Sequence, residues 1–225
     1  VCVDLQHGPV FLDRADEMLT AISATPATPL ARPSSNDFAE INKLLDAGAY
    51  GVIVPMIDTV EDARRVVDAV RYPPRGRRSF GPARGILYGG ADYAAHADDE
   101  MLAFAMIEPP QGLATLDAIA AVDGLEGPFT GPAALSIALG VPPVPKWRDE
   151  PLRGAIARIH AAARAHGKLC GVFCSSLEMG ADMRAAGFDM VVPGNDANLL
   201  RNAVQGWCDA VRGEKGSGPK PGSGY

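Results

Sequence analysis

Short apolar runs alternate with segments of helical periodicity along almost the whole chain. Apolar runs bounded by turn residues predict strands at residues 1–5, 28–33, 51–55, 101–108, 127–130, 168–174 and 188–192. Apolar residues three and four apart predict helices at 13–23, 37–48, 59–72, 113–120, 152–166 and 196–211. One further helix is expected to begin at a capping box of Ser175 and Glu178. Residues 75–99, rich in Gly and Arg, predict a long irregular excursion.

The alternation of strands and helices with short connections indicates an α/β fold, in which helices cover a parallel sheet. A doubly wound open sheet and a (β/α)8 TIM barrel both fit this pattern. A strand at the very first residue favours the barrel, with its first strand and helix upstream of Val1. We therefore expect an N-terminally incomplete barrel domain at 1–212. Residues 213–225, rich in Gly, Ser, Pro and Lys, are expected to form a flexible tail.

The composition is that of a folded domain and narrows the range of partners. Of 225 residues 47% are hydrophobic, and 21 Lys and Arg against 27 Asp and Glu give a net charge of −6, which argues against a nucleic-acid binder. The chain has no apolar run of the ~20 residues that a membrane helix requires and no secretion signal, so we expect a cytoplasmic protein that does not bind membranes. The four scattered cysteines are expected to be reduced core thiols: Cys2, Cys170, Cys174 and Cys208.

Polar residues stand where the first two predicted strands end, and ligands bind at the carboxyl ends of strands in both architectures. Asp4 and His7 follow the first strand, and Arg32 follows the second. A histidine three residues after an aspartate suits a general base whose tautomer the carboxylate fixes, but a solvated loop histidine has the same spacing. Arg32 suits a planar carboxylate or an enolate oxygen, and equally a structural ion pair.

Two later strand ends carry further candidates. Glu108 ends an apolar run, and a buried carboxylate there requires a cation or hydrogen-bond donors. A metal ion is one interpretation, and a salt bridge to a loop arginine is the other. Gly131 and Pro132 lead through Ala133 and Ala134 into a short helix, where free backbone N–H groups suit a small anion.

Two other groups of residues are weaker candidates. Cys170 and Cys174 lie four apart on one predicted strand and face the same side, which favours packing over metal binding. The second group consists of Arg71, Arg75, Arg77, Arg78 and Arg84. Basic loops of this kind are more typical of solvated surface or subunit contacts than of phosphate sites.

Several short motifs connect these residues to a known family. They are Val3–Gly8 (VDLQHG), Ala31–Pro33 (ARP), Leu45–Ala49 (LDAGA), Val54–Met56 (VPM), Arg71–Pro74 (RYPP), Gly76–Arg78 (GRR), Met106–Glu108 (MIE) and Gly131–Ser136 (GPAALS). Together they resemble the HpcH/HpaI aldolase family, the metal-dependent class II pyruvate aldolases related to citrate lyase, and within it the fungal-type branch that includes macrophomate synthase. The likeness runs from about Val1 to Arg201.

The resemblance implies a (β/α)8 barrel that acts as a carbon–carbon lyase on small α-keto acids, by aldol cleavage or by decarboxylation of oxaloacetate through a pyruvate enolate. It also implies a divalent metal, usually Mg²⁺ with Mn²⁺ or Co²⁺ as substitutes. Oligomers are implied as well, with a trimer of dimers as one form, in which terminal helices exchange between partners. By position, His7 assisted by Asp4 would be the acid/base, Arg32 would neutralise the enolate oxygen, and Glu108 would bind the metal.

The remaining motif, Gly131–Ala134, would bind the substrate carboxylate through its backbone amides. Here the chain departs from the family, because the loop normally reads Gly-Pro-x-Asp-Leu-Ser and its Asp is the second metal ligand. Ala134 stands at that position. Loss of one carboxylate predicts weaker metal binding, and it keeps open an alternative function, a non-catalytic barrel that binds keto acids or serves as a scaffold. The excursion at 75–99 is expected to set substrate size.

Overall fold

Seven parallel strands form one curved sheet in the computed structural model, which describes residues 1–108, 110–143 and 146–213. The strands are β1 (Cys2–Asp4), β2 (Leu30–Arg32), β3 (Gly51–Val54), β4 (Leu102–Met106), β5 (Gly127–Thr130), β6 (Gly171–Phe173) and β7 (Met190–Val192). They pair in chain order, and β1 and β7 form the two edges of the sheet. All seven predicted strands are confirmed, each within its predicted apolar run.

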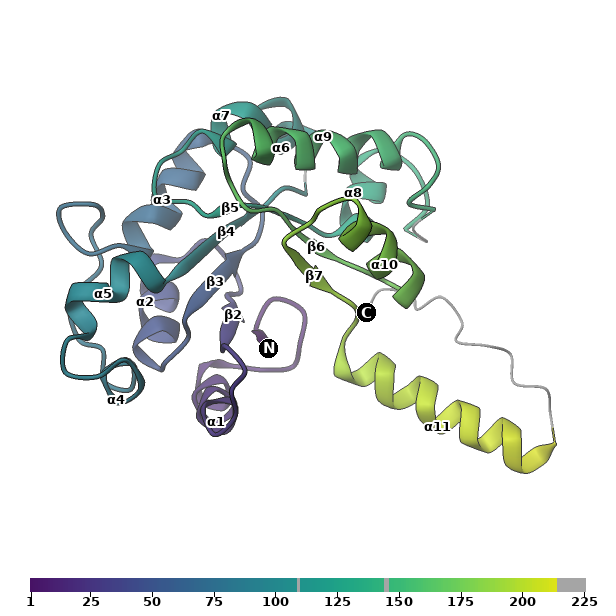
Figure 1. Ribbon diagram of the computed structural model, residues 1–225, viewed down its shortest axis with the longest axis horizontal. Helices are drawn as coiled ribbons and strands as arrows, with labels where there is room; N and C mark the ends of the chain where they lie inside the picture. The colour runs from purple at the N-terminus through teal and green to yellow at the C-terminus, as the bar shows by residue number, and fades with distance from the viewer. Residues whose placement is uncertain (109, 144–145, 214–225) are drawn as a thin grey trace.

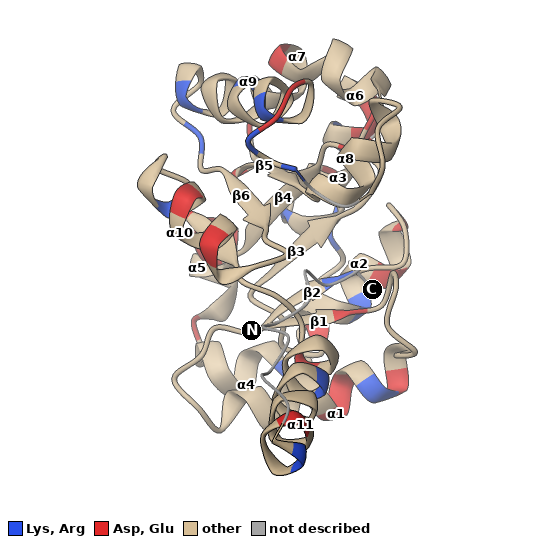
Figure 2. Cartoon of the chain, turned by 90° about the vertical axis from the view of Figure 1, so that its right-hand side faces the viewer, with Lys and Arg blue, Asp and Glu red and all other residues tan. Residues whose placement is uncertain are grey.

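Helices surround the outer side of the sheet, and the last helix extends away from the rest of the molecule (Figure 1). The helices are α1 (Leu12–Ser23), α2 (Phe38–Asp46), α3 (Val60–Val70), α4 (Gly85–Gly89), α5 (Tyr93–Glu100), α6 (Pro110–Ala114), α7 (Leu116–Ala120), α8 (Pro132–Ala138), α9 (Leu152–Ala165), α10 (Leu177–Ala185) and α11 (Asp196–Arg212). The result is a curled half-barrel, consistent with the predicted TIM barrel lacking one β/α unit. Figure 2 shows acidic and basic residues interspersed over the helices. Among the described residues, none of the helices is long and apolar enough to span a membrane.

Apolar side chains fill both sides of the sheet. Ile53, Phe104, Met106 and Phe129 meet in a buried cluster on its inner side. A larger buried cluster lies between the sheet and the helices. Every position of β3 is buried. Since alternate residues of a strand face opposite sides, β3 is covered on both faces, as expected in a parallel sheet.

Side chains and a glycine set the helix boundaries near β3. Asp37 caps α2 by accepting a backbone N–H, and Thr59 forms a capping box with Asp62 at the start of α3. Gly48 follows α2 with φ at +103°, where residues other than glycine are strained. These two helices fix where β3 begins and ends.

The helical predictions need correction at three places. The capping residue of α10 is Ser176, whose side chain accepts the N–H of Met179, so the predicted box at Ser175 is wrong by one residue. The predicted helix at 113–120 is two short helices, which meet at Thr115. The excursion at 75–99 is less irregular than predicted, since it includes α4 and most of α5.

The last helix, α11, ends at Arg212, and the domain boundary predicted there stays a prediction. Gly213 follows in a left-handed conformation, with φ at +70°. Residues 214–225 of the predicted tail lie outside the described residues, so the tail stays a prediction.

Candidate active site

One cavity lies at the carboxyl ends of the strands. It measures about 40 Å³, and its lining comes from the ends of β1, β2, β4, β5 and β6 or the residues directly after them. The lining residues are His7, Arg32, Met106, Glu108, Gly131, Ala133, Ala134 and Phe173. Three charged or titratable residues that are far apart in the sequence, His7, Arg32 and Glu108, therefore surround one space.

Asp4 and Arg32 form an ion pair beside this cavity. The parallel register places the two residues directly opposite each other at the ends of β1 and β2. The Arg32 Nε donates to Asp4 Oδ1 at 2.7 Å, and Nη2 donates to Oδ2, so the carboxylate binds the guanidinium with both oxygens. Burial alone would raise the pKa of the Asp4 carboxyl, but the hydrogen bonds and charge of Arg32 outweigh it and lower that pKa below its ordinary value. Asp4 thus stays ionised and fixes the orientation of Arg32.

The Asp4 carboxylate also organises the turn that carries His7. Its Oδ1 accepts the backbone N–H groups of Gln6 at 3.0 Å and of His7 at 3.4 Å. A carboxylate that accepts N–H groups two and three residues later is a local turn motif that fixes the backbone. One side chain therefore positions both the guanidinium of Arg32 and the backbone of His7 at the cavity.

Glu108 lies two residues beyond β4, and only 6% of it is exposed. Its Oε2 accepts the backbone N–H of Met56 at 3.2 Å. The alternative from the sequence, a salt bridge to a loop arginine, is not observed among the described residues, and four of those arginines pair with other carboxylates. The pairs are Arg71 with Glu126, Arg75 with Asp99, Arg78 with Asp46 and Arg84 with Asp16.

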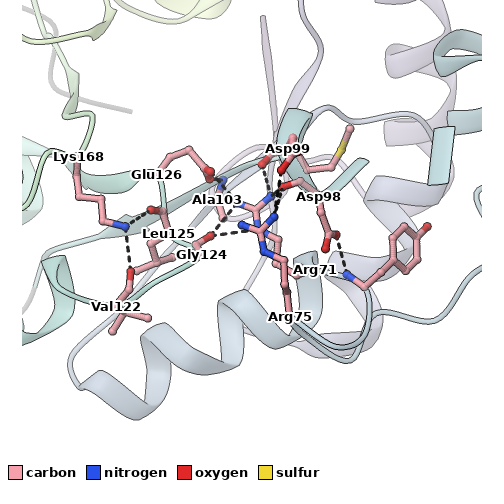
Figure 3. Close-up of polar contacts among 12 residues, drawn as sticks. Arg71, Arg75, Asp98, Asp99, Ala103, Val122, Gly124, Leu125, Glu126 and Lys168 are labelled. Carbon is pink, nitrogen blue, oxygen red and sulfur yellow. Dashed lines mark hydrogen bonds and ion pairs between the residues drawn. The ribbon is translucent and has the colours of Figure 1, made fainter. Parts of the chain in front are cut away.

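These arginines are structural, and two of them are not solvated as the sequence suggested. Arg71 and Arg78 are each 1% exposed. Arg71 connects α3 to the start of β4 and to the segment before β5, with Arg75 beside it (Figure 3). The excursion at 75–99 runs from α3 to β4. It therefore lies at the amino ends of the strands, away from the cavity. Residues 75–99 contribute nothing to the cavity lining, which corrects the expectation that they set substrate size.

The segment Gly131–Ala134 begins α8, as expected, and three of its four residues line the cavity. Pro132 is buried as the first residue of the helix and is not among the lining residues. A helix leaves its first N–H groups without an intrahelical acceptor. The N–H groups of Ala133 and Ala134 belong to that first turn, so the cavity wall includes donors for a small anion.

The same wall approaches Glu108. A Cβ added to Gly131 would lie 3.9 Å from Glu108 Oε1. Among the described residues, there is no group of three or more His, Cys, Asp and Glu side chains that could share a metal ion. Of the described residues that line the cavity, Glu108 is the one carboxylate, and Ala134 adds none. Since Mg²⁺ often takes one or two protein carboxylates together with water and substrate oxygens, this donor set fits a cation that binds with its substrate.

Sequence reasoning missed two apolar lining residues, Met106 and Phe173, and one backbone donor, Met56. Both apolar residues are the last residues of their strands and alternate with buried neighbours that face the helices. Strict alternation from Val172, which packs with the helices, would have assigned Phe173 to the inner side. Met56 ends one of the family motifs, but no local pattern indicates its contact with Glu108, which joins residues 52 positions apart.

All four cysteines are free, as expected, but not all are core residues. Cys170 and Cys174 are fully buried, and burial raises the pKa of each thiol to about 12. They pack against the helices and are poor metal ligands in this protonated state. Cys2 is half-buried and Cys208 is exposed, which corrects the prediction for these two.

Comparisons with known proteins show the family and the fold of the chain. The sequence model of HpcH/HpaI aldolase/citrate lyase matches residues 1–203. A hydroxypyruvate/pyruvate aldolase of Rhizorhabdus wittichii is 40% identical over 205 residues, which cover 91% of this chain and 82% of that protein. The crystal structure of an HpcH/HpaI aldolase/citrate lyase family protein from Burkholderia cenocepacia has a TM-score of 0.86 and 28% identity, covering 94% of this chain and 84% of that one. Macrophomate synthase has a TM-score of 0.82 and 25% identity, covering 95% and 76%.

Proposed function

Because the chain belongs to the HpcH/HpaI aldolase/citrate lyase family, we propose that it is a metal-dependent carbon–carbon lyase that acts on α-keto acids through a pyruvate enolate. The observation that carries this proposal is the single cavity shared by His7, Arg32 and Glu108. A base, a fixed cation and a buried carboxylate are the groups that enolate chemistry requires. The hydroxypyruvate/pyruvate aldolase of Rhizorhabdus wittichii supports pyruvate or hydroxypyruvate as the keto-acid part of the substrate.

Each residue of the cavity then has a role in aldol cleavage. His7 accepts the proton of the substrate's C4 hydroxyl as the C3–C4 bond breaks, and the electron pair of that bond moves into the enolate of pyruvate. Arg32, held by both oxygens of Asp4, faces the negative charge that develops on the enolate oxygen. The N–H groups of Ala133 and Ala134 donate to the substrate carboxylate. In oxaloacetate decarboxylation the same groups stabilise the enolate that forms as CO₂ leaves.

Glu108 would hold the divalent cation, with Mg²⁺ as the expected ion. When bound, such a cation polarises the keto group and lowers the energy of the enolate. With one protein carboxylate, the site depends on oxygens of the keto acid for further coordination. We therefore expect metal and keto acid to bind together, each strengthening the binding of the other.

Ala134 favours a second candidate function, a barrel that binds keto acids without turnover or serves as a scaffold. Calorimetry with oxalate or pyruvate separates the two candidates. Binding of these ligands that requires Mg²⁺, together with turnover of oxaloacetate or of an aldol substrate, supports the lyase. Binding without metal dependence or turnover supports the second function.

The decisive experiment uses Ala134→Asp, which restores the carboxylate expected at this position. Oxaloacetate decarboxylation and pyruvate-releasing aldol cleavage are measured with Mg²⁺ or Mn²⁺, with and without a chelator. We expect the substitution to raise activity and to lower the metal concentration that gives half-maximal rate. Ala133→Asp is the matched control, because it adds the same charge to the neighbouring lining residue and should not reproduce the gain. The lyase proposal is refuted if neither the wild-type chain nor Ala134→Asp releases product.

Within the family, the comparisons favour the bacterial pyruvate aldolases over the macrophomate synthase branch that the motifs suggested. The Rhizorhabdus aldolase is 40% identical to this chain, against 25% for macrophomate synthase. We therefore assign the substrate class from the pyruvate aldolases.

We also propose that the protein is a homo-oligomer in which α11 packs against a second copy. The helix extends away from the half-barrel (Figure 1) and carries large apolar side chains that are more than half exposed. These are Leu199, Leu200, Val204, Trp207 and Val211. An apolar stripe of this size on one helix is typical of an interface.

A further inference from the structure

Met56 has an unusual backbone conformation next to the candidate active site. Among the described residues it is the one non-glycine residue with a positive φ, at +56°. Residues with a side chain adopt this left-handed conformation at a cost, and such strain persists only where the surrounding structure imposes it. Burial of the side chain does not compensate for the cost, because Met56 is 56% exposed. The benefit must therefore come from the backbone.

The residues around Met56 show how this conformation is imposed. Ile57 is fully buried, and its N–H donates to the carbonyl of Met106 at 3.1 Å, at the end of β4. From the other side, α6 approaches so closely that a Cβ on Gly112 would lie 2.8 Å from the carbonyl oxygen of Ile57. Thr115 donates its hydroxyl to the carbonyl of Asp58 at 2.6 Å. The segment after β3 is thus fixed against β4 and α6.

In this fixed position the N–H of Met56 points at Glu108 and donates to its Oε2 at 3.2 Å. The other oxygen, Oε1, lies on the side of Gly131 and the start of α8. A hydrogen bond to one carboxylate oxygen restricts rotation of the carboxylate and leaves the other oxygen for a ligand in the cavity. This restriction matters more in a chain whose second carboxylate position is Ala134.

We infer that Met56 is a positioning residue, whose strained backbone directs an N–H at Glu108 and so holds that carboxylate ready for the divalent cation and the keto acid. The inference rests on the proposed function and deepens it. It predicts that cation affinity depends on the left-handed conformation of Met56 and not on its thioether.

Two substitutions separate an effect of the left-handed conformation from an effect of the side chain. Met56→Val places a β-branched residue where a positive φ is most strained, so the N–H should turn away from Glu108. Met56→Gly removes the side chain but accepts the left-handed conformation. The readout is the affinity for Mn²⁺ with oxalate present, measured by calorimetry, together with the melting temperature of each variant. We expect Val to weaken Mn²⁺ binding about tenfold, the lower end of the loss that follows when a metal ligand loses a hydrogen-bond partner outside the coordination shell, while Gly keeps the wild-type affinity.

Equal affinities for wild type, Val and Gly overturn the inference, and so does an equal loss in both variants, which would assign the effect to the side chain. If Met56→Val fails to fold, an ester in place of the Met56 amide removes the N–H alone and is expected to give the same tenfold loss. Unchanged Mn²⁺ affinity in the ester variant overturns the inference while the proposed function stands. A wild-type chain that binds no Mn²⁺ with oxalate overturns both.

Discussion

Replacing Arg71 by methionine tests whether the amino ends of the strands serve stability alone. The guanidinium is 1% exposed and lies among three backbone carbonyls and one carboxylate. It donates to the carbonyls of Gly124 at 2.7 Å, Asp98 at 2.8 Å and Met101 at 2.6 Å, and to Glu126 Oε1 at 2.6 Å (Figure 3). Methionine fills much of the same volume and donates to none of them.

The size of the effect follows from the groups left without a donor. Each buried acceptor that loses its partner costs about 1–3 kcal/mol. The cost is smaller for Glu126, whose side chain is 22% exposed, and for the carbonyl of Asp98, which also accepts from Arg75 Nη1 at 3.5 Å. We therefore expect Arg71→Met to lower the free energy of unfolding by about 3–5 kcal/mol. Glu126→Gln should cost less, about 1–2 kcal/mol, because the guanidinium keeps its three carbonyl acceptors.

The double variant Arg71→Met with Glu126→Leu makes the test sharper. Replacing a simple buried ion pair by apolar residues is often neutral or stabilising. Here the carbonyls of Gly124 and Met101 still lack the guanidinium, and Glu126→Leu also removes the carboxylate that accepts the backbone N–H of Ala103. The double variant should therefore be at least as unstable as Arg71→Met. Urea unfolding followed by circular dichroism gives the free energies, and calorimetry at low temperature gives keto-acid affinity in the folded state. The reasoning is refuted if the double variant regains wild-type stability, or if a folded Arg71→Met loses keto-acid affinity.

The partners of Arg71 also show where sequence reasoning stops. Apolar periodicity predicts the strands because each strand's burial is a property of its own residues, as all four positions of β3 illustrate. It predicts His7, Arg32 and Glu108 at one cavity because parallel strands end at the same edge. The acceptors of Arg71 lie at positions 98, 101 and 124, and no local pattern indicates which distant carbonyls a guanidinium will meet.

Other details of the site escape the sequence for related reasons. The spacing of Asp4 and His7 predicts that the two act together. It does not reveal that the Asp4 carboxylate binds Arg32 with both oxygens, because that contact depends on the β1–β2 register. The left-handed backbone of Met56 has no signal at all, since such strain is imposed by packing and not by the residue's own preference. Ser175 and Ser176 are adjacent, so the composition of the turn fits either as the cap.

Two further predictions concern Asp4 and α11. Asp4→Asn should lower stability by about 1–2 kcal/mol at neutral pH. Because the pKa of Asp4 is lowered in the folded state, the stabilisation by its carboxylate is complete above the unfolded pKa of about 3.9 and is lost as the pH falls through the folded value. Urea unfolding should therefore show the free energies of wild type and Asp4→Asn converging below about pH 4. A difference in free energy that stays constant with pH would contradict the pairing. For α11, Trp207→Ser removes an aromatic ring that is 80% exposed and should shift the mass by light scattering toward the monomer. Leu177→Ser is the matched control, since Leu177 is 77% exposed on α10 and its loss should leave the oligomer intact. A wild-type chain that is monomeric at micromolar concentration, or an equal response to both substitutions, would show that the apolar stripe of α11 does not hold the oligomer together.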